Sequence, residues 1–241
     1  MTRTLVLSAL SAVMVALGGY VYLSMSQQVV SDQTRLPLMA VGAQETDESS
    51  DAAAADATAQ EADTPEVMEM VEGSPDAPIT VIEYASLTCP HCARFSQEVY
   101  PQLVENYVDT GQVQFVLREV YFDRYGLWAG MVARCGGPLR YFGIVEMMFE
   151  EQRDWVQGEP ADVAENLRRI GRRAGLSDDQ LEQCLSDNAM AQAMVTLSTE
   201  QSTADEIQGT PSFVINGELY SNMSYADFSE LLDGMLADSQ E

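Results

Sequence analysis

The spacing of apolar residues from position 67 onward predicts the order of strands and helices. Residues 79–85 (ITVIEYA) are almost continuously apolar, which is typical of a strand covered on both faces, and residues 113–120 (VQFVLREV) repeat that pattern. Helical spacing begins at Pro90, and Gly111 suits the end of this helix. Its apolar stripe consists of Phe95, Val99, Leu103, Val104, Tyr107 and Val108. Because the order is strand, helix, strand, we expect a parallel pair with a right-handed crossover.

The last part of the chain predicts a hairpin and a final helix. Residues 213–220 (FVINGELY) predict two short strands joined by Asn216-Gly217, a sequence that favours a type I′ turn. The final helix has an apolar face made of Tyr225, Phe228, Leu231, Leu232, Met235 and Leu236. Residues 121–208, approximately, show little strand pattern and contain amphipathic helical segments broken at glycines. The predicted fold class is therefore α/β, a small mixed sheet ordered β-α-β, helical insertion, β-β-α.

The first 66 residues follow a different pattern. Residues 5–23 are apolar apart from hydroxyl groups, and as a helix they would rise ~28 Å, close to the ~30 Å of a bilayer's hydrocarbon core. Arg3 precedes them, which places the rest of the chain outside the cytoplasm. We predict that residues 1–25 are a signal anchor, with a cleaved signal peptide as the alternative. Residues 26–66 include an acidic, Ala-rich stretch without aromatic residues and predict a disordered linker before a domain at 67–241.

Composition narrows the function classes. The chain has 241 residues, with 12 basic residues, all of them arginine, against 38 acidic ones, and its formal charge is −26. This surplus of acid excludes a general nucleic-acid binder, which needs clustered positive charge. One histidine and four cysteines leave little for a metal site, so we expect neither a metal nor an organic cofactor. Because the compartment outside the cytoplasm is oxidising, the cysteines predict disulfide chemistry.

The motif Cys89-Pro90-His91-Cys92 lies where the first strand ends and the first helix begins. Cys89 falls at the N-cap and Pro90 at the first helical position, where a missing N–H costs nothing. The unpaired N–H groups of the first turn and the positive end of the helix dipole then face the Cys89 sulfur, so we expect its pKa to be depressed. His91 adds an N–H donor, and Cys92 is expected to be the shielded resolving thiol. A stabilised thiolate makes the corresponding disulfide an oxidant of other thiols.

A zinc site and a structural disulfide are the other interpretations of this cysteine pair. Zinc needs two further ligands, but the remaining cysteines are distant in sequence and there is no second histidine. A structural disulfide rarely spans two residues at the start of a helix. We therefore interpret Cys89 and Cys92 as a redox-active pair.

Two segments, ITVIEYASLTCPHCARF at residues 79–95 and GTPSFVING at residues 209–217, resemble the DsbA-like thiol:disulfide oxidoreductases of the thioredoxin superfamily. The resemblance covers roughly residues 67–238 and implies a thioredoxin-like fold. It implies donation of a disulfide, through a mixed disulfide, to exported unfolded proteins with free thiols on the periplasmic side of the inner membrane. It also implies reoxidation by a quinone-linked membrane partner of the DsbB type. The alternatives are a reductase or isomerase of the same fold, and an anchored peptide-binding or chaperone module.

The resemblance also implies roles for residues outside the motif. The proline matching Pro211 is cis in the family and lies against the active-site cysteine, and the residue matching Thr210 pairs its main chain with substrate. An ordinary loop proline is the alternative, and the threonine also occurs in related reductases and isomerases. An acid matching Glu83 lies beneath the cysteine pair and assists proton transfer with Cys92. The alternative is an exposed Glu83 paired with Arg118 on the neighbouring strand.

The remaining cysteines, Cys135 and Cys184, lie in the helical insertion. A second disulfide of this kind occurs in some DsbA-like proteins, so we expect a structural bridge here, with two free thiols as the alternative. The bridge would close a loop of about 50 residues and stabilise the fold by ~4 kcal/mol in the chain-entropy model.

One basic cluster repeats at helical spacing within the insertion. It either orients the protein toward anionic lipid or a partner, or is a solvated helix face supported by nearby acids. Its members are Arg168, Arg169, Arg172 and Arg173.

Overall fold

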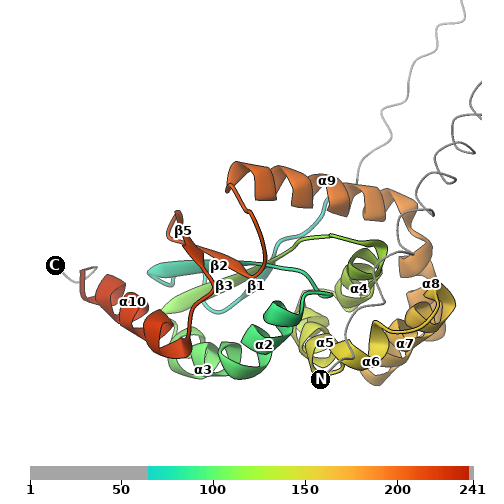
Figure 1. The fold of residues 1–241 in the computed structure, drawn as a ribbon, viewed down its shortest axis with the longest axis horizontal. Helices are drawn as coiled ribbons and strands as arrows, with labels where there is room; N and C mark the ends of the chain where they lie inside the picture. The colour runs from blue at the N-terminus through green and yellow to red at the C-terminus, as the bar shows by residue number, and fades with distance from the viewer. Residues whose placement is uncertain (1–64, 239–241) are drawn as a thin grey trace, which may run out of the picture. The chain divides into compact units, whose positions relative to one another are not determined.

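The computed structural model describes residues 65–238, which are coloured in Figure 1. The predicted signal anchor at residues 1–25 and nearly all of the predicted linker at 26–66 lie outside the described residues. Within residues 65–238, no helix combines the length and the apolar content that crossing a bilayer requires.

A five-stranded mixed sheet occupies the centre, in the order β1-β3-β2-β4-β5. The strands are β1 (Met70–Glu72), β2 (Ile79–Ala85), β3 (Val113–Glu119), β4 (Ser212–Ile215) and β5 (Glu218–Ser221). β2 and β3 pair in parallel, whereas β4 pairs antiparallel with both β2 and β5, as the predicted order requires. The sequence analysis missed β1, which pairs antiparallel with β3 and, at three residues, is too short to show an alternating pattern.

The helix predicted from Pro90 is divided into three segments. They are α2 (Pro90–Glu98), α3 (Tyr100–Leu103) and the π-helical segment η1 (Val104–Val108). The break falls just before Pro101, whose ring collides with the carbonyl four residues earlier in a continuous α-helix. The apolar stripe nevertheless faces the core, since Phe95, Leu103 and Tyr107 are buried.

Helices fill the chain between β3 and β4. They are α4 (Arg124–Cys135), α5 (Pro138–Glu150), α6 (Gln152–Trp155), α7 (Pro160–Arg173), α8 (Asp178–Ser186) and α9 (Asn188–Ala204). A disulfide joins Cys135, at the end of α4, to Cys184 in α8. The disulfide thus links two helices of the inserted helical subdomain, α4 and α8, to each other.

The sheet is covered on both faces, as its continuous apolar strands predict. In Figure 1, α2, α3 and the last helix, α10 (Tyr225–Asp238), lie below the sheet and α9 lies above it. On the lower side, the rings of Phe95, Phe213 and Phe228 join α2, β4 and α10, with Phe213 centred 4.7 Å from Phe95 and 4.9 Å from Phe228. This aromatic cluster sets the position of α2, and therefore of the motif at its start.

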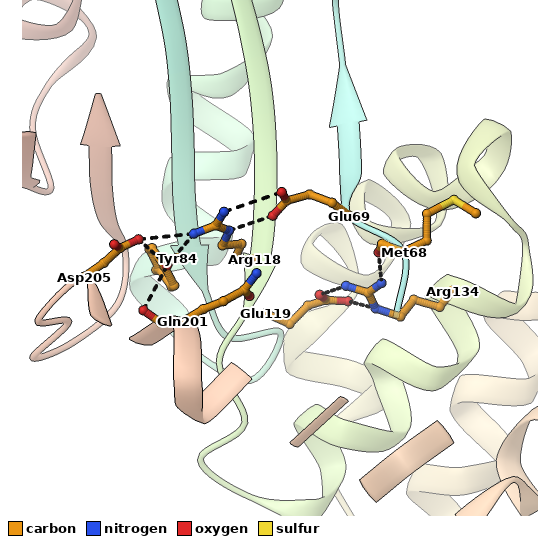
Figure 2. A network of polar contacts seen from close by, with 8 residues as sticks. All are labelled: Met68, Glu69, Tyr84, Arg118, Glu119, Arg134, Gln201 and Asp205. Carbon is orange, nitrogen blue, oxygen red and sulfur yellow. Dashed lines mark hydrogen bonds and ion pairs between the residues drawn. The ribbon is translucent and has the colours of Figure 1, made fainter. Parts of the chain in front are cut away.

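Two arginines fasten the edge strand β1 and the chain leading into it (Figure 2). Arg118 on β3 binds Glu69 at 2.7 Å and Asp205 at 3.2 Å. Arg134 on α4 binds the Glu119 carboxylate and donates to the Met68 carbonyl oxygen at 2.6 Å. A planar guanidinium suits such multiple contacts, and here both groups tie the chain before β1 to the sheet and the insertion.

The basic cluster on α7 is paired with acids of the same chain. Its four arginines form five ion pairs, which are Arg168–Glu182, Arg169–Glu151, Arg172–Glu165, Arg172–Asp178 and Arg173–Glu151. These pairs favour the solvated helix face over a free positive patch, because each guanidinium already has a carboxylate partner.

Candidate active site

The chain turns sharply between β2 and α2, and this turn places Cys89. The Cys89 N–H donates to the Ser86 carbonyl oxygen at 3.0 Å. Cys89 is the N-cap of α2, with φ −82° and ψ 119°, and Pro90 occupies the first helical turn, as the sequence predicts. The free N–H groups of the turn are therefore directed toward the Cys89 sulfur.

A glutamine from the helical insertion supports this turn. The Gln152 side chain, at the start of α6, donates to the carbonyl oxygens of Leu87 at 2.8 Å and Cys89 at 3.0 Å. Gln152 is only 5% exposed. Sequence reasoning missed this residue, and nothing in the local pattern of residues 150–156 could have shown that its side chain reaches a turn more than sixty residues earlier.

The environment of Cys89 stabilises its thiolate. The pKa of Cys89 is lowered to about 5, chiefly because the Cys92 thiol donates a hydrogen bond to it, with further help from the backbone N–H groups of Cys92 and His91. Partial burial opposes this shift and is outweighed. His91 is exposed, and it contributes to the thiolate through its main chain.

Cys92 lies in the opposite environment. It is fully buried, and burial first, then its hydrogen bond to Cys89 and the charge of Glu83, raise its pKa far above the usual value. Both cysteines are in the dithiol form in this structure. One sulfur is therefore accessible and anionic while the other is shielded and protonated.

The loop before β4 meets the motif from across the sheet. The carbonyl oxygen of Thr210 lies 3.4 Å from Cys89 Sγ, although 121 residues separate the two in sequence. The Thr210–Pro211 peptide bond is cis, and Pro211 is buried. The structure thus brings together the two segments that carry the resemblance.

Glu83 is buried within the sheet, at 4% exposure. Burial first, and the nearby Cys89 charge second, raise its pKa to about 8. Pairing with Arg118 is excluded, because Arg118 lies opposite Tyr84 in the register of β2 and β3 and binds the Tyr84 hydroxyl at 2.8 Å. Adjacent strand residues point to opposite faces, so Glu83 and Arg118 lie on different sides of the sheet.

Within residues 65–238, no group of three or more histidine, cysteine, aspartate or glutamate side chains is arranged to hold a metal ion. The reactive groups that the structure brings together here are the two sulfurs, the Glu83 carboxyl and the Thr210 main chain.

A mixed sheet, a cysteine pair at the start of a helix and a facing cis-proline loop together define a thioredoxin-fold protein of the dithiol/disulfide type. A model of the thioredoxin family matches residues 65–234. The chain belongs to this family, and its DsbA-like character is shown by the relatives that it matches.

Two curated relatives illustrate the match. A Rickettsia bellii protein described as a protein-disulfide oxidoreductase is 31% identical over 173 residues, which are 71% of this chain and 66% of the relative. Disulfide bond formation protein D of Bacillus subtilis is 27% identical over 170 residues, 67% of this chain and 72% of the relative. The chain spans between 62% and 66% of the length of the rickettsial relatives.

Solved structures agree with this assignment. The crystal structure of alpha-DsbA1 from Wolbachia pipientis superposes with a TM-score of 0.64 at 28% identity, covering 72% of this chain and 94% of that one. BdbD from Bacillus subtilis, at 23% identity and a TM-score of 0.63, shares the fold.

Proposed function

We propose that this protein is a thiol oxidant that donates a Cys89–Cys92 disulfide to exported, unfolded proteins with free thiols. One observation carries the proposal, namely that the pKa of Cys89 is lowered to about 5 while Cys92 is buried and held as a thiol. A free cysteine has a pKa of about 8.5. A thiolate this stable favours the reduced form of the site, which makes the disulfide form a strong oxidant and Cys89 a good leaving group.

The reaction follows from this difference between the two sulfurs. A client thiolate attacks Cys89 Sγ, the bond to Cys92 breaks, and Cys92 leaves and takes up a proton. The second client thiolate then attacks the client sulfur of the mixed disulfide, and Cys89 leaves as a thiolate. The client gains a disulfide, and the protein retains two electrons.

Client binding is proposed for the main chain beside Cys89. The Thr210 carbonyl lies next to the reactive sulfur, and an extended client segment could pair with it as an added strand. Main-chain pairing does not depend on client sequence, which suits a donor of broad range. His91 and Pro90 complete the motif, and Glu83 exchanges the proton of Cys92.

The cellular setting is also part of the proposal. The apolar segment at residues 5–23 and the acidic linker after it support a domain held on the periplasmic side of the inner membrane, or released there after cleavage. Reoxidation then falls to a quinone-linked membrane protein of the DsbB type.

Titration of the Cys89 thiolate tests the proposal directly. The ultraviolet absorbance of the thiolate, followed against pH in the reduced protein, should change with a midpoint near 5, the pKa set by the environment of Cys89. The Cys89→Ser variant is the control, because it removes this signal. Equilibration with glutathione should give a reduction potential nearer the about −120 mV of DsbA than the about −270 mV of thioredoxin.

A midpoint close to that of free cysteine would contradict the oxidant. A potential near that of thioredoxin would indicate a reductase instead. If Cys89→Ala left the cellular phenotype intact, the peptide-binding module would be the better account.

A further inference from the structure

A small cavity lies behind the Glu83 carboxyl, between the sheet and helices α2, α3 and α5. Its volume is about 20 Å³, and roughly 10–15 Å³ is enough to hold one water molecule. Most of its wall is apolar and consists of Phe115, Leu117, Phe142, Val145 and Phe149. Its polar lining consists of Glu83, Ser96, Tyr100 and Glu146.

The two carboxyl groups of this cavity differ in their access to solvent. Glu83 is buried, and its Oε1 has no hydrogen-bond partner among the described residues. Glu146, on α5, is exposed. A buried polar atom without a protein partner is commonly satisfied by water in an adjacent polar space. The cavity therefore connects an interior acid to one at the surface.

The other polar side chains leave this connection open. The Tyr100 hydroxyl donates to Glu72 Oε2 on β1, so its proton is directed away from Glu83. Ser96, on α2, contributes a small hydroxyl to the wall. No arginine lines the cavity among the described residues, so no cation there competes for either carboxylate.

We propose that a water molecule in this cavity carries protons between Glu83 and Glu146, and that Cys92 exchanges its proton with solvent by this route. The inference rests on the proposed function, since it concerns the same thiol pair. Glu146 is a positioning residue in this scheme, because it acts through water and Glu83. It belongs to the helical insertion, which would thereby take part in the chemistry of the thioredoxin-fold core.

The proton balance is the same in both directions of the cycle. When a client thiolate breaks the Cys89–Cys92 bond, neutral Glu83 protonates the leaving Cys92, and a proton from solvent restores Glu83 through Glu146 and the water. During reoxidation by a disulfide oxidant, Cys92 gives its proton to the Glu83 carboxylate and attacks Cys89 in the mixed disulfide. The oxidant leaves as a thiolate, and the proton departs by the same route.

The groups around Glu83 favour exchange of a proton over permanent ionisation. The Cys89 thiolate adds to the effect of burial on the pKa of Glu83. Burial raises the pKa of Tyr100, and so do the carboxylates of Glu72, Glu83 and Glu146, which places all three acids within electrostatic reach of one phenol. Cys92 also lies within electrostatic reach of Glu83, because the charge of Glu83 raises the pKa of the Cys92 thiol.

Reaction of the reduced, full-length protein with dithionitrobenzoate separates the two thiols in time. The first release of thionitrobenzoate reports attack by Cys89, and the second reports attack by Cys92 on the resulting mixed disulfide. A positioned proton-transfer group contributes about 10²–10⁴-fold, so through one water we expect E146Q to slow the second release by about 5- to 20-fold near neutral pH. The first release should be unchanged.

The matched control is E150Q, which changes an exposed acid one turn further along α5 that does not line the cavity. E83Q should slow the second release more than E146Q, and E83Q/E146Q should be no slower than E83Q, because both acids serve one route. A wild-type rate in E146Q, equal slowing in E150Q, or additive losses would overturn the inference. Failure of the proposed function would instead appear as an ordinary Cys89 pKa in the unmodified protein.

Discussion

Glu83 is a carboxylic acid in a strand whose neighbouring side chains are apolar. Its pKa in the folded protein is about 8, against an ordinary value of 4.5, and the rise comes from burial first and from the Cys89 charge second. The folded protein therefore binds a proton that the unfolded chain has already lost between these two pH values. An acid with a raised pKa lowers stability progressively as the pH rises through that window.

Replacement of Glu83 by glutamine removes this pH-dependent cost. Below about pH 4.5 both states hold the proton, so E83Q should change stability little there. Near pH 8 the variant should be more stable than the parent by about 4–5 kcal/mol, from about 1.4 kcal/mol for each unit by which the pKa is raised. Urea unfolding at both pH values measures the difference, and a gain that is equal at both would show that ionisation is not its cause.

Ionisation of Cys89 changes the stability of the fold with pH in the opposite direction to that of Glu83. The pKa of Cys89 is lower in the folded protein, about 5 against an ordinary value of 9.0. The reduced form therefore gains stability as the pH rises from about 5 to about 9 and loses it on acidification. The oxidised form has no thiolate and receives none of this stabilisation. The difference between the two redox forms should therefore shrink in acid, where the site becomes a weaker oxidant relative to a dithiol of ordinary pKa.

At the scale of elements, the turn between β2 and α2 depends on a contact from α6. Gln152 satisfies two carbonyl oxygens of this turn, and the N-cap of α4 lies beside it, where Thr88 Oγ1 donates to Asp123 at 2.8 Å. The insertion thus holds the peptide that presents the reactive sulfur.

Replacement of Gln152 by leucine tests this support. The side-chain volume is nearly kept, but the Leu87 and Cys89 carbonyl oxygens lose a donor, which costs about 1–3 kcal/mol when the group is buried. Chemical denaturation should show a loss of this size. Q157L is the control, since Gln157 is an exposed glutamine whose side chain donates to the nearby Arg153 carbonyl oxygen and not to the turn between β2 and α2. Equal losses in both variants would contradict the assigned role.

An element could be predicted where a long run of its residues shows the pattern of apolar and polar positions typical of that element. β2 and β3 were predictable because seven consecutive positions in each carry the pattern of a buried strand. The hairpin was predictable because an Asn-Gly pair favours positive φ, and Asn216 and Gly217 adopt φ of 49° and 90°. β1 depends instead on contacts of Arg118 and Arg134 that no local pattern encodes. The sequence indicates the division of the first helix by Pro101, but the apolar stripe continues across this proline and predicts a single helix.

At the scale of the whole molecule, the site joins segments that are distant in sequence. The position of Cys89 at the helix start was predictable from four adjacent residues, whereas the approach of Thr210 was expected only from the resemblance. Gln152 and Glu146 were not predicted, because a glutamine or glutamate on an amphipathic helix does not indicate which distant loop or cavity it meets.

Removal of the second disulfide measures how far the insertion stabilises the whole molecule. The bond between Cys135 and Cys184 closes a loop with a sequence separation of 49. The C135S/C184S variant should lose about 4 kcal/mol in the chain-entropy model. Thermal unfolding of the variant against the parent, both with the Cys89–Cys92 pair reduced, gives the value. An unchanged melting temperature would show that α4 and α8 are held by packing alone.

The two guanidinium groups at the edge of the sheet have a mechanical consequence. A protein held at its N-terminus while a client pulls on Cys89 would be under tension, and that tension would enter the folded part close to Met68 and Glu69. These residues are held by Arg134 and Arg118, so the load would pass sideways into α4 and β3 before it could peel β1 from the sheet. Tension from the N-terminal segment would then reach α4 and β3 without distorting the turn that carries Cys89.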